Sequence, residues 1–163
     1  MSLSHPMLST ELAALCERDI ARLIQELKAF PDTASVWTTA PGVTNAAGTL
    51  ALHLEGNLRE YVGRQLGQIA FKRDRALEFS ARGVERQEII ARLEAVKAQI
   101  PPVVAALSAA QLDAIYPENV LGKPITTRQF LVHLAGHLNY HLGQVDYLRR
   151  ITTGKGAIDL AGL

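Results

Sequence analysis

Three histidines near the C-terminal end of the chain are the residues best suited to chemistry. His133, His137 and His141 are spaced four residues apart, so on a helix they follow one another at successive turns. Two imidazoles one turn apart have Cβ atoms about 5 to 6 Å from each other and can share one metal ion. Histidine pairs that face solvent have the same spacing, so spacing alone does not choose among the three.

The apolar residues between these histidines indicate which imidazoles face a core. At about 100° per residue, His141 lies inside the apolar arc of the predicted helix, His137 at its edge and His133 further round. We therefore expect His137 and His141 to be the inward pair and His133 to be dispensable. The arc is formed by Phe130, Leu131, Leu134, Leu138, Leu142, Val145 and Leu148.

His53 is the natural third ligand, because it lies among aliphatic residues in a separate amphipathic segment. Three histidines from two helices leave at least one coordination position for water or substrate, as in catalytic zinc sites. Asn57 and Tyr61 follow His53 at one and two turns and are candidates for the open side of the site. Gln144, one turn beyond His141, is a candidate to support a ligand or to contact a substrate.

Four long segments with helical periodicity must position these residues. No segment shows the sustained alternation of a β-strand, so the predicted class is all-α, and the expected architecture is a four-helix bundle. We expect a single domain over residues 1–163, with short tails at about 1–7 and 153–163. The four segments are residues 8–27, 50–66, 89–100 and 127–151.

Capping residues indicate where these helices begin and end. Ser9 or Thr10 can cap the start of the first helix, and the second ends near Gly67. Thr126 caps the start of the last helix, and Gly154 is placed to terminate it.

The connections and the third helix depart from regular helical patterns. Residues 31–48 form a long connection rich in turn residues. Residues 71–86 carry five basic and three acidic side chains, which favours a solvated link over a binding patch. Pro101 and Pro102 interrupt the third apolar pattern, so that helix is expected to be kinked or split there.

Composition excludes several classes of protein. The chain has one cysteine, so no disulfide framework is possible, and Cys16 is expected to be a core residue. Seventeen Lys and Arg residues against sixteen Asp and Glu residues leave a net charge of +1, which argues against a nucleic-acid partner. No apolar run reaches about 18 residues, so no membrane partner is expected and the cytoplasm is the expected location.

Residues 137–144 read H-x-x-x-H-x-G-Q, and this motif resembles the last bundle helix of the DinB/YfiT-like superfamily of metalloenzymes. Other stretches are similar to an uncharacterised small branch of the same superfamily. These are Trp37 with residues 41–45, residues 52–54, 56–58, 73–75, 78–80 and 147–150.

The resemblance implies a four-helix bundle, usually homodimeric, that holds one divalent ion, commonly zinc or nickel. It implies one histidine ligand on the second helix and two on the last, which fall on His53, His137 and His141. Characterised members include transferases and isomerases that use a low-molecular-weight thiol such as bacillithiol, mycothiol or glutathione. The sequence does not fix which thiol, if any, applies here.

Two classes of function stay open at this point. The first is a metal-dependent enzyme, a thiol-dependent transferase or a related hydrolase or isomerase. The second is a non-enzymatic metal-binding bundle with a stress-related structural role or a role in sensing small ligands. The sequence identifies no catalytic residue and no carboxylate beside the three histidines, since Glu55 should point away from His53.

Overall fold

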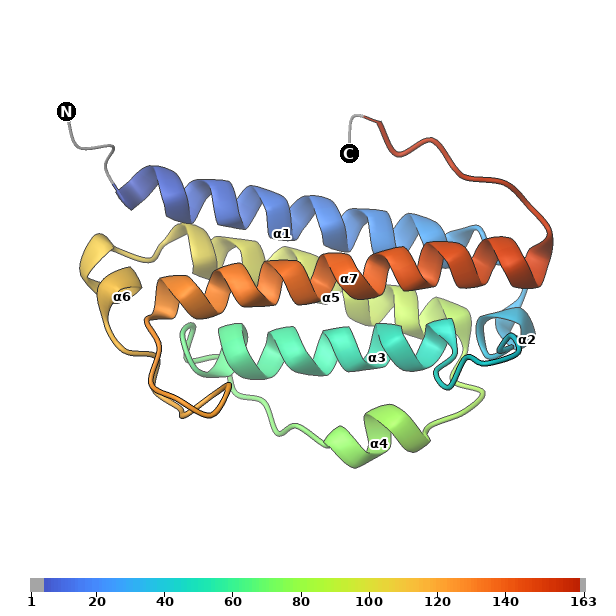
Figure 1. Cartoon of the computed structure of the whole chain (residues 1–163), viewed down its shortest axis with the longest axis horizontal. Coiled ribbons are helices and arrows are strands. Elements are labelled where there is room, and N and C mark those ends of the chain that lie inside the picture. Colours follow the sequence, from blue (N-terminus) through green and yellow to red (C-terminus); the bar gives the residue numbers. More distant parts are fainter. Residues whose placement is uncertain (1–4, 162–163) are drawn as a thin grey trace.

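The computed structural model describes residues 5–161, with side chains from residue 8 onward, and residues 1–4 and 162–163 lie outside this description. Within the described residues the chain is helical and forms no strand, which confirms the predicted all-α class (Figure 1). None of these helices is long and apolar enough to cross a membrane.

Four long helical stretches build the body of the molecule. Helix α1 packs against α5 and α7, and α3 also packs against α5 and α7, so each long helix has two long neighbours (Figure 1). Helix α3 continues directly into a π-helical turn, η1. The long elements are α1 (His5–Lys28), α3 (Ala47–Leu58) with η1 (Arg59–Arg64), α5 (Arg86–Ala105) and α7 (Thr127–Thr153), and the short ones are α2 (Thr33–Val36), α4 (Arg75–Ser80) and α6 (Ala109–Asp113).

The core lies where the apolar stripes of these helices meet. Each fully buried aliphatic side chain contributes about 1.5 to 3 kcal/mol relative to exposure, so this core is the main source of stability. Its fully buried members include Ile20, Leu23, Leu27, Leu54, Leu93, Ile100 and Leu138, which come from all four long helices.

The predicted ends of the last helix are confirmed, whereas the predicted start of the first is wrong. The Thr126 hydroxyl accepts a hydrogen bond from the Gln129 N–H at 3.1 Å, and Gly154 ends α7 in the left-handed conformation at φ +68°. Helix α1 begins at His5 and not at Ser9 or Thr10. Pro6 lies in its first turn, where a missing N–H costs nothing because no helical partner exists for it.

Helix α5 continues through both of its prolines. Pro101 and Pro102 lie inside α5, which ends four residues later at its C-cap, Ala106, so a split at this point is excluded and a kink stays a prediction. The prolines deprive the carbonyls of Lys97 and Ala98 of their usual donors. Lys97 is half-buried and Ala98 is exposed, so water can reach this side of the helix.

The two long connections pack against α3, which is buried over its whole length. In the first, the Trp37 indole covers Gly48, where a Cβ would lie 2.9 Å from the ring, and its N–H donates to the Val84 carbonyl at 3.0 Å. In the second, residues 71–86 contain α4, which packs on α3 and buries Glu78. Most residues of this segment are exposed, as a solvated link predicts, but the sequence did not indicate that Glu78 is buried against α3.

Candidate metal centre

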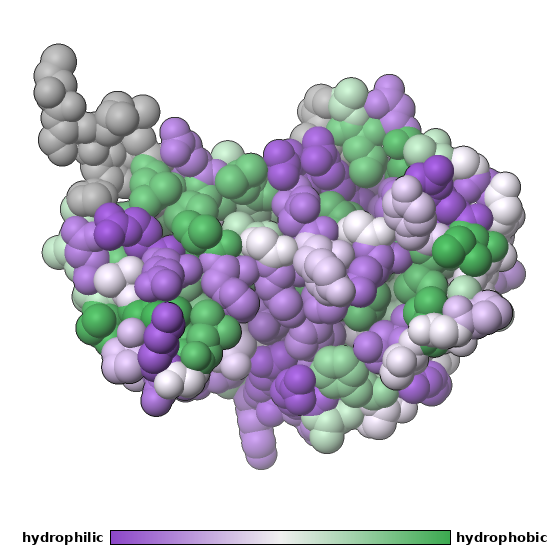
Figure 2. All heavy atoms as spheres, viewed as in Figure 1, coloured by the Kyte–Doolittle hydropathy of each residue, from purple (hydrophilic) through white to green (hydrophobic). Residues whose placement is uncertain are grey.

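Helices α3 and α7 bring His53, His137 and His141 together, although the sequence separates the first from the others by more than 80 residues. Each contributes a ring nitrogen, and the three nitrogens lie within 4.8 Å of one another. His53 is 7% exposed, and His137 and His141 are half-buried. Figure 2 shows hydrophilic residues gathered over the middle of α7 and α3, between apolar patches on either side.

The cluster has the inward orientation that the apolar arc of α7 predicts. His137 and His141 are one turn apart, with ring centroids 4.6 Å from each other, and both face the His53 ring at 5.1 and 5.4 Å. The Nε2 atoms of His53 and His137 are 3.2 Å apart. His133 is exposed, and its ring centroid lies 6.3 Å from that of His137.

A buried carboxylate fixes the orientation of His53. The Glu78 Oε2 accepts a hydrogen bond from His53 Nδ1–H at 3.1 Å, which leaves the Nε2 lone pair directed at the cluster. Arg73 donates to both oxygens of Glu78, from Nε at 2.7 Å and from Nη2 at 2.9 Å. This pairing holds the Glu78 carboxylate against His53.

Gly56 allows Glu78 to reach His53. A Cβ at position 56 would overlap the Glu78 carboxylate, so any larger residue would push this carboxylate away. Helix propensity disfavours glycine at this interior position of α3, and the close approach of Glu78 is the structural reason for it.

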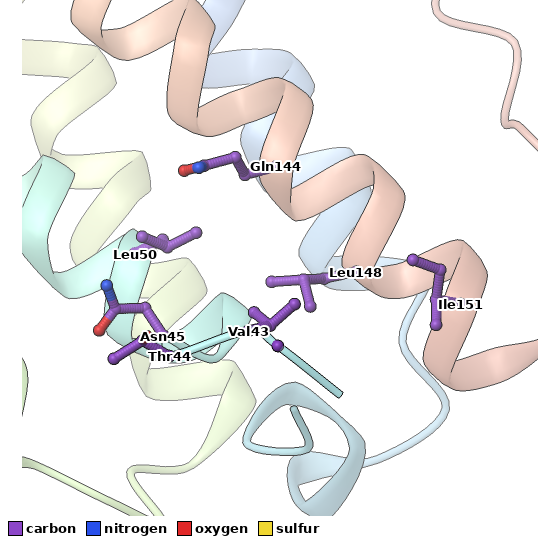
Figure 3. A pocket seen from close by; sticks show the side chains of 8 residues that line it. Val43, Thr44, Asn45, Leu50, Gln144, Leu148 and Ile151 are labelled. Carbon is purple, nitrogen blue, oxygen red and sulfur yellow. The ribbon is translucent and has the colours of Figure 1, made fainter. Parts of the chain in front are cut away.

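Gln144 supports His141 in the way that Glu78 supports His53. The Gln144 Oε1 accepts a hydrogen bond from His141 Nδ1 at 2.6 Å, so Nε2 is the free nitrogen of this ring as well. Gln144 also lines a cavity of about 320 Å³ with Asn45 and Leu50. Figure 3 shows Gln144 reaching from α7 towards Leu50 of α3 at one side of this cavity.

Burial lowers the pKa of two of the three imidazoles, those of His137 and His53. The pKa of His137 is lowered to about 4, chiefly because burial disfavours its charged form and secondly because His141 and His53 would repel that charge. Burial also lowers the pKa of His53, and the Glu78 carboxylate opposes this shift without reversing it. Neutral imidazole is the form that coordinates a metal ion.

One pair of these imidazole nitrogens has the spacing of ligands on a divalent transition-metal ion, and the third nitrogen lies within 4.8 Å of both. Nitrogen ligands at zinc–nitrogen bond lengths of about 2.0 to 2.1 Å around a tetrahedral ion are about 3.3 to 3.4 Å apart, close to the distance between His53 and His137 Nε2. His137 Nδ1 is buried without a hydrogen-bond partner, so the other ring nitrogen of His137 carries its polar contacts within the cluster. Imidazole donors suit zinc and nickel, whereas calcium and magnesium prefer oxygen.

A polar cavity opens beside the cluster. Its volume is about 410 Å³, and His53 and His137 form part of its wall together with Asn57, Tyr61 and His133. The predicted pocket residues are thus divided between two cavities, since Asn57 and Tyr61 line this one and Gln144 lines the other. His133 lines the polar cavity and can contact a ligand there, but it is not part of the histidine cluster.

Glu78 and Arg73 are the residues that reasoning from helical spacing missed. Their segment has no helical periodicity that relates it to His53, and its charge density suggested solvent. The only signal was the similarity of residues 73–75 and 78–80 to the family pattern.

Comparison with known proteins identifies relatives of the fold. A sequence model of the DinB superfamily matches residues 15–145. The crystal structure of a DinB-like protein from Bacillus cereus is similar with a TM-score of 0.64 and 19% identity, over 86% of this chain and 91% of that one. A conserved protein from Enterococcus faecalis gives a TM-score of 0.64 and 18% identity, over 94% of this chain and 100% of that one. No curated protein matches the sequence.

Proposed function

The chain belongs to the DinB superfamily, and from this membership we propose that it is a metal-dependent enzyme that binds one divalent ion through His53, His137 and His141. Zinc and nickel are the ions that this donor set favours. The observation that carries the proposal is the convergence of three imidazole nitrogens within 4.8 Å, two of them at the wall of a polar cavity.

A bound divalent ion supplies Lewis acidity and lowers the pKa of a water or thiol at its open position. The protein's own contribution is to present the imidazoles. Glu78 and Gln144 accept hydrogen bonds from the Nδ1–H groups of His53 and His141, which leaves both Nε2 lone pairs free to bind a metal ion. Supporting partners of this kind typically change metal affinity or activity by about 10- to 100-fold.

The polar cavity is the side on which we place the substrate. Asn57 and Tyr61 lie along α3 and η1 from His53, and they offer a carbonyl and a phenol to a bound molecule. The reaction class that family membership favours is a thiol-dependent transfer, or a related hydrolysis or isomerisation, with a low-molecular-weight thiol as co-substrate. A cavity of about 410 Å³ is within the range that small-molecule sites occupy.

We also propose that the protein is a homodimer. Tyr140, Tyr147 and Ile151 are large, apolar and exposed, and they recur at seven- and four-residue steps on one face of α7. Light scattering of the purified protein tests this directly.

Metal analysis of single alanine variants tests the metal site. We expect one ion per chain in the parent protein and in His133→Ala, and loss of the ion in His53→Ala, His137→Ala and His141→Ala. A full complement of metal in His137→Ala would refute the site.

Activity is tested on metal-loaded protein with a panel of thiols and electrophilic acceptors, with the triple alanine variant as control. Turnover that depends on the three histidines supports the enzyme. If the protein binds metal but turns over no combination of thiol and acceptor, the alternative of a non-enzymatic bundle is favoured.

A further inference from the structure

The polar cavity beside the histidine cluster carries one cation whose charge is not offset. Arg73 lines the cavity but pairs with Glu78, and the lining carboxylate Glu118 lies 3.0 Å from Arg64, which also pairs with Glu60. Arg75 also lines the cavity and makes no ion pair with any residue between positions 8 and 161. The charge available to a ligand is therefore that of Arg75.

Phe79 places this cation close to the candidate metal ligands. The Arg75 guanidinium lies over the Phe79 ring, 5.1 Å from its centroid, and the same ring lies 4.9 Å from the centroid of His53. A cation held on an aromatic face keeps its N–H groups free at its edge, where they can donate to a planar anion.

Asn57 supplies a second, independent sign of a missing ligand. Its side chain is 8% exposed and lines the cavity, and its Oδ1 has no hydrogen-bond partner. A buried carbonyl oxygen without a donor is costly, and nearly all such atoms in folded proteins are paired. The Oδ1 is covered in this conformation, so an N–H or O–H group of a bound molecule would satisfy it once the Asn57 amide turns towards the cavity.

We propose that this cavity binds a small substrate that carries one carboxylate, paired with Arg75, and a hydroxyl or amine donor, bound to Asn57 Oδ1. The inference rests on the proposed function in treating the cavity as the substrate side of the metal centre. A carboxylate matches the single lining cation that makes no ion pair within the described part of the chain. Guanidinium and carboxylate also form two parallel hydrogen bonds.

The inference is tested by calorimetric titration of the metal-loaded protein with three thiols. Each thiol differs from the previous one by a single group. They are 3-mercaptopropionamide, which is neutral, 3-mercaptopropionate, which adds the carboxylate, and 2-hydroxy-3-mercaptopropionate, which adds a hydroxyl donor. We expect affinity to rise about tenfold with the carboxylate and again by a few-fold with the hydroxyl.

Variants assign each gain to its residue. Arg75→Gln should remove the preference for the carboxylate, and Asn57→Ala should remove the gain from the hydroxyl. Arg82→Gln is the matched control, because Arg82 lies in the same segment and carries the same charge but does not line the cavity. An unchanged carboxylate preference in Arg75→Gln, or an equal loss in Arg82→Gln, would overturn the inference.

The same three probes are also titrated against metal-free protein and followed by ligand-observed NMR, which detects weak binding. We expect the same order of affinities. Absence of bound metal would refute the proposed metal site alone, since the order of the probes on the metal-free protein still decides on the carboxylate. If 3-mercaptopropionamide and 3-mercaptopropionate bind equally well to the metal-loaded and to the metal-free protein, the carboxylate site is refuted and the metal site is unaffected.

Discussion

The protonation state of His137 links the candidate site to stability. Its pKa is about 4 in the folded protein against an ordinary value of 6.5, so the unfolded chain binds more protons between these values. In metal-free protein the stabilisation from neutral His137 is therefore complete above about pH 6.5 and is lost as the pH falls towards 4. Burial of His53 acts in the same direction.

We expect the free energy of unfolding of the metal-free protein, measured in urea, to fall between pH 7 and pH 5. In His137→Gln this fall should be smaller, because the variant lacks an imidazole that the unfolded chain protonates in this range and the folded protein keeps neutral. Identical slopes in the two proteins would show that folding does not lower the pKa of His137.

Gly56 should affect metal affinity only because it leaves room for the Glu78 carboxylate beside His53. We expect Gly56→Ala to lower metal affinity by about 10- to 100-fold, because the added methyl displaces the carboxylate that orients His53. Glu78→Ala should have a similar effect, and the double variant should be no worse than Glu78→Ala. Additive losses in this double-mutant cycle would mean that Gly56 has a separate role.

Helical geometry predicted His137 and His141 as the inward pair, because a residue's angle on a helix follows from its number alone. His53 was expected from its aliphatic neighbours in a separate segment. Helical geometry gave no route to Glu78, which lies 25 residues from His53 in a segment without a regular period. The contact depends on how the 71–86 segment folds back onto α3, and this is a tertiary feature. That Arg75 makes no ion pair with residues 8–161 also depends on the tertiary structure, because other arginines pair with the nearby carboxylates.

At the level of single elements, replacing the prolines of α5 by alanine measures how much each proline destabilises the helix. Pro102 is exposed, so replacing it by alanine restores an N–H opposite the Ala98 carbonyl and removes no packing. We expect Pro102→Ala to raise the free energy of unfolding by about 1 to 2 kcal/mol, less than the roughly 3 kcal/mol of a mid-helix proline because the unfolded chain gains freedom.

Pro101→Ala provides the comparison for this gain. Pro101 is buried, so the same backbone repair is offset by lost packing and the net gain should be smaller. If Pro102→Ala is neutral or destabilising, the helix is bent at this point in a way that alanine cannot relieve.

The start of α7 followed from one threonine and its end from one glycine, because both ends obey local capping rules. The π-helical turn η1 had no such signal. There the Tyr61 carbonyl accepts a hydrogen bond from the Tyr116 hydroxyl at 2.7 Å, and burial raises the pKa of that hydroxyl. The partner lies 55 residues away, so no local pattern in residues 59–64 could indicate it.

At the scale of the whole molecule, a buried ion pair joins α1 to α7. Its arginine also bonds to the segment that follows α7. Arg149 is 1% exposed, pairs with Glu26 and Asp146, and donates to the Gly156 carbonyl at 3.1 Å. Burial raises the pKa of Glu26 even though Arg149 acts to lower it. The pair therefore carries a desolvation cost that only a complete set of partners offsets.

We expect Arg149→Ala to lower the free energy of unfolding by about 3 to 5 kcal/mol, because it leaves Glu26 buried and unpaired. Lys97→Ala breaks an exposed pair with Glu94 and should cost less than about 1 kcal/mol. Similar losses in the two variants would indicate that burial does not set the strength of this pair.

The different sequence distances within the histidine cluster set the order in which it assembles. His137 and His141 become neighbours as soon as one turn of α7 forms, within about a microsecond. His53 lies 84 residues from His137, so it can join them only after α3 has docked, and closing so long a loop carries an entropic cost. An ion captured early by the pair on α7 would then act as a template for that docking, and metal supply would influence how quickly the chain folds.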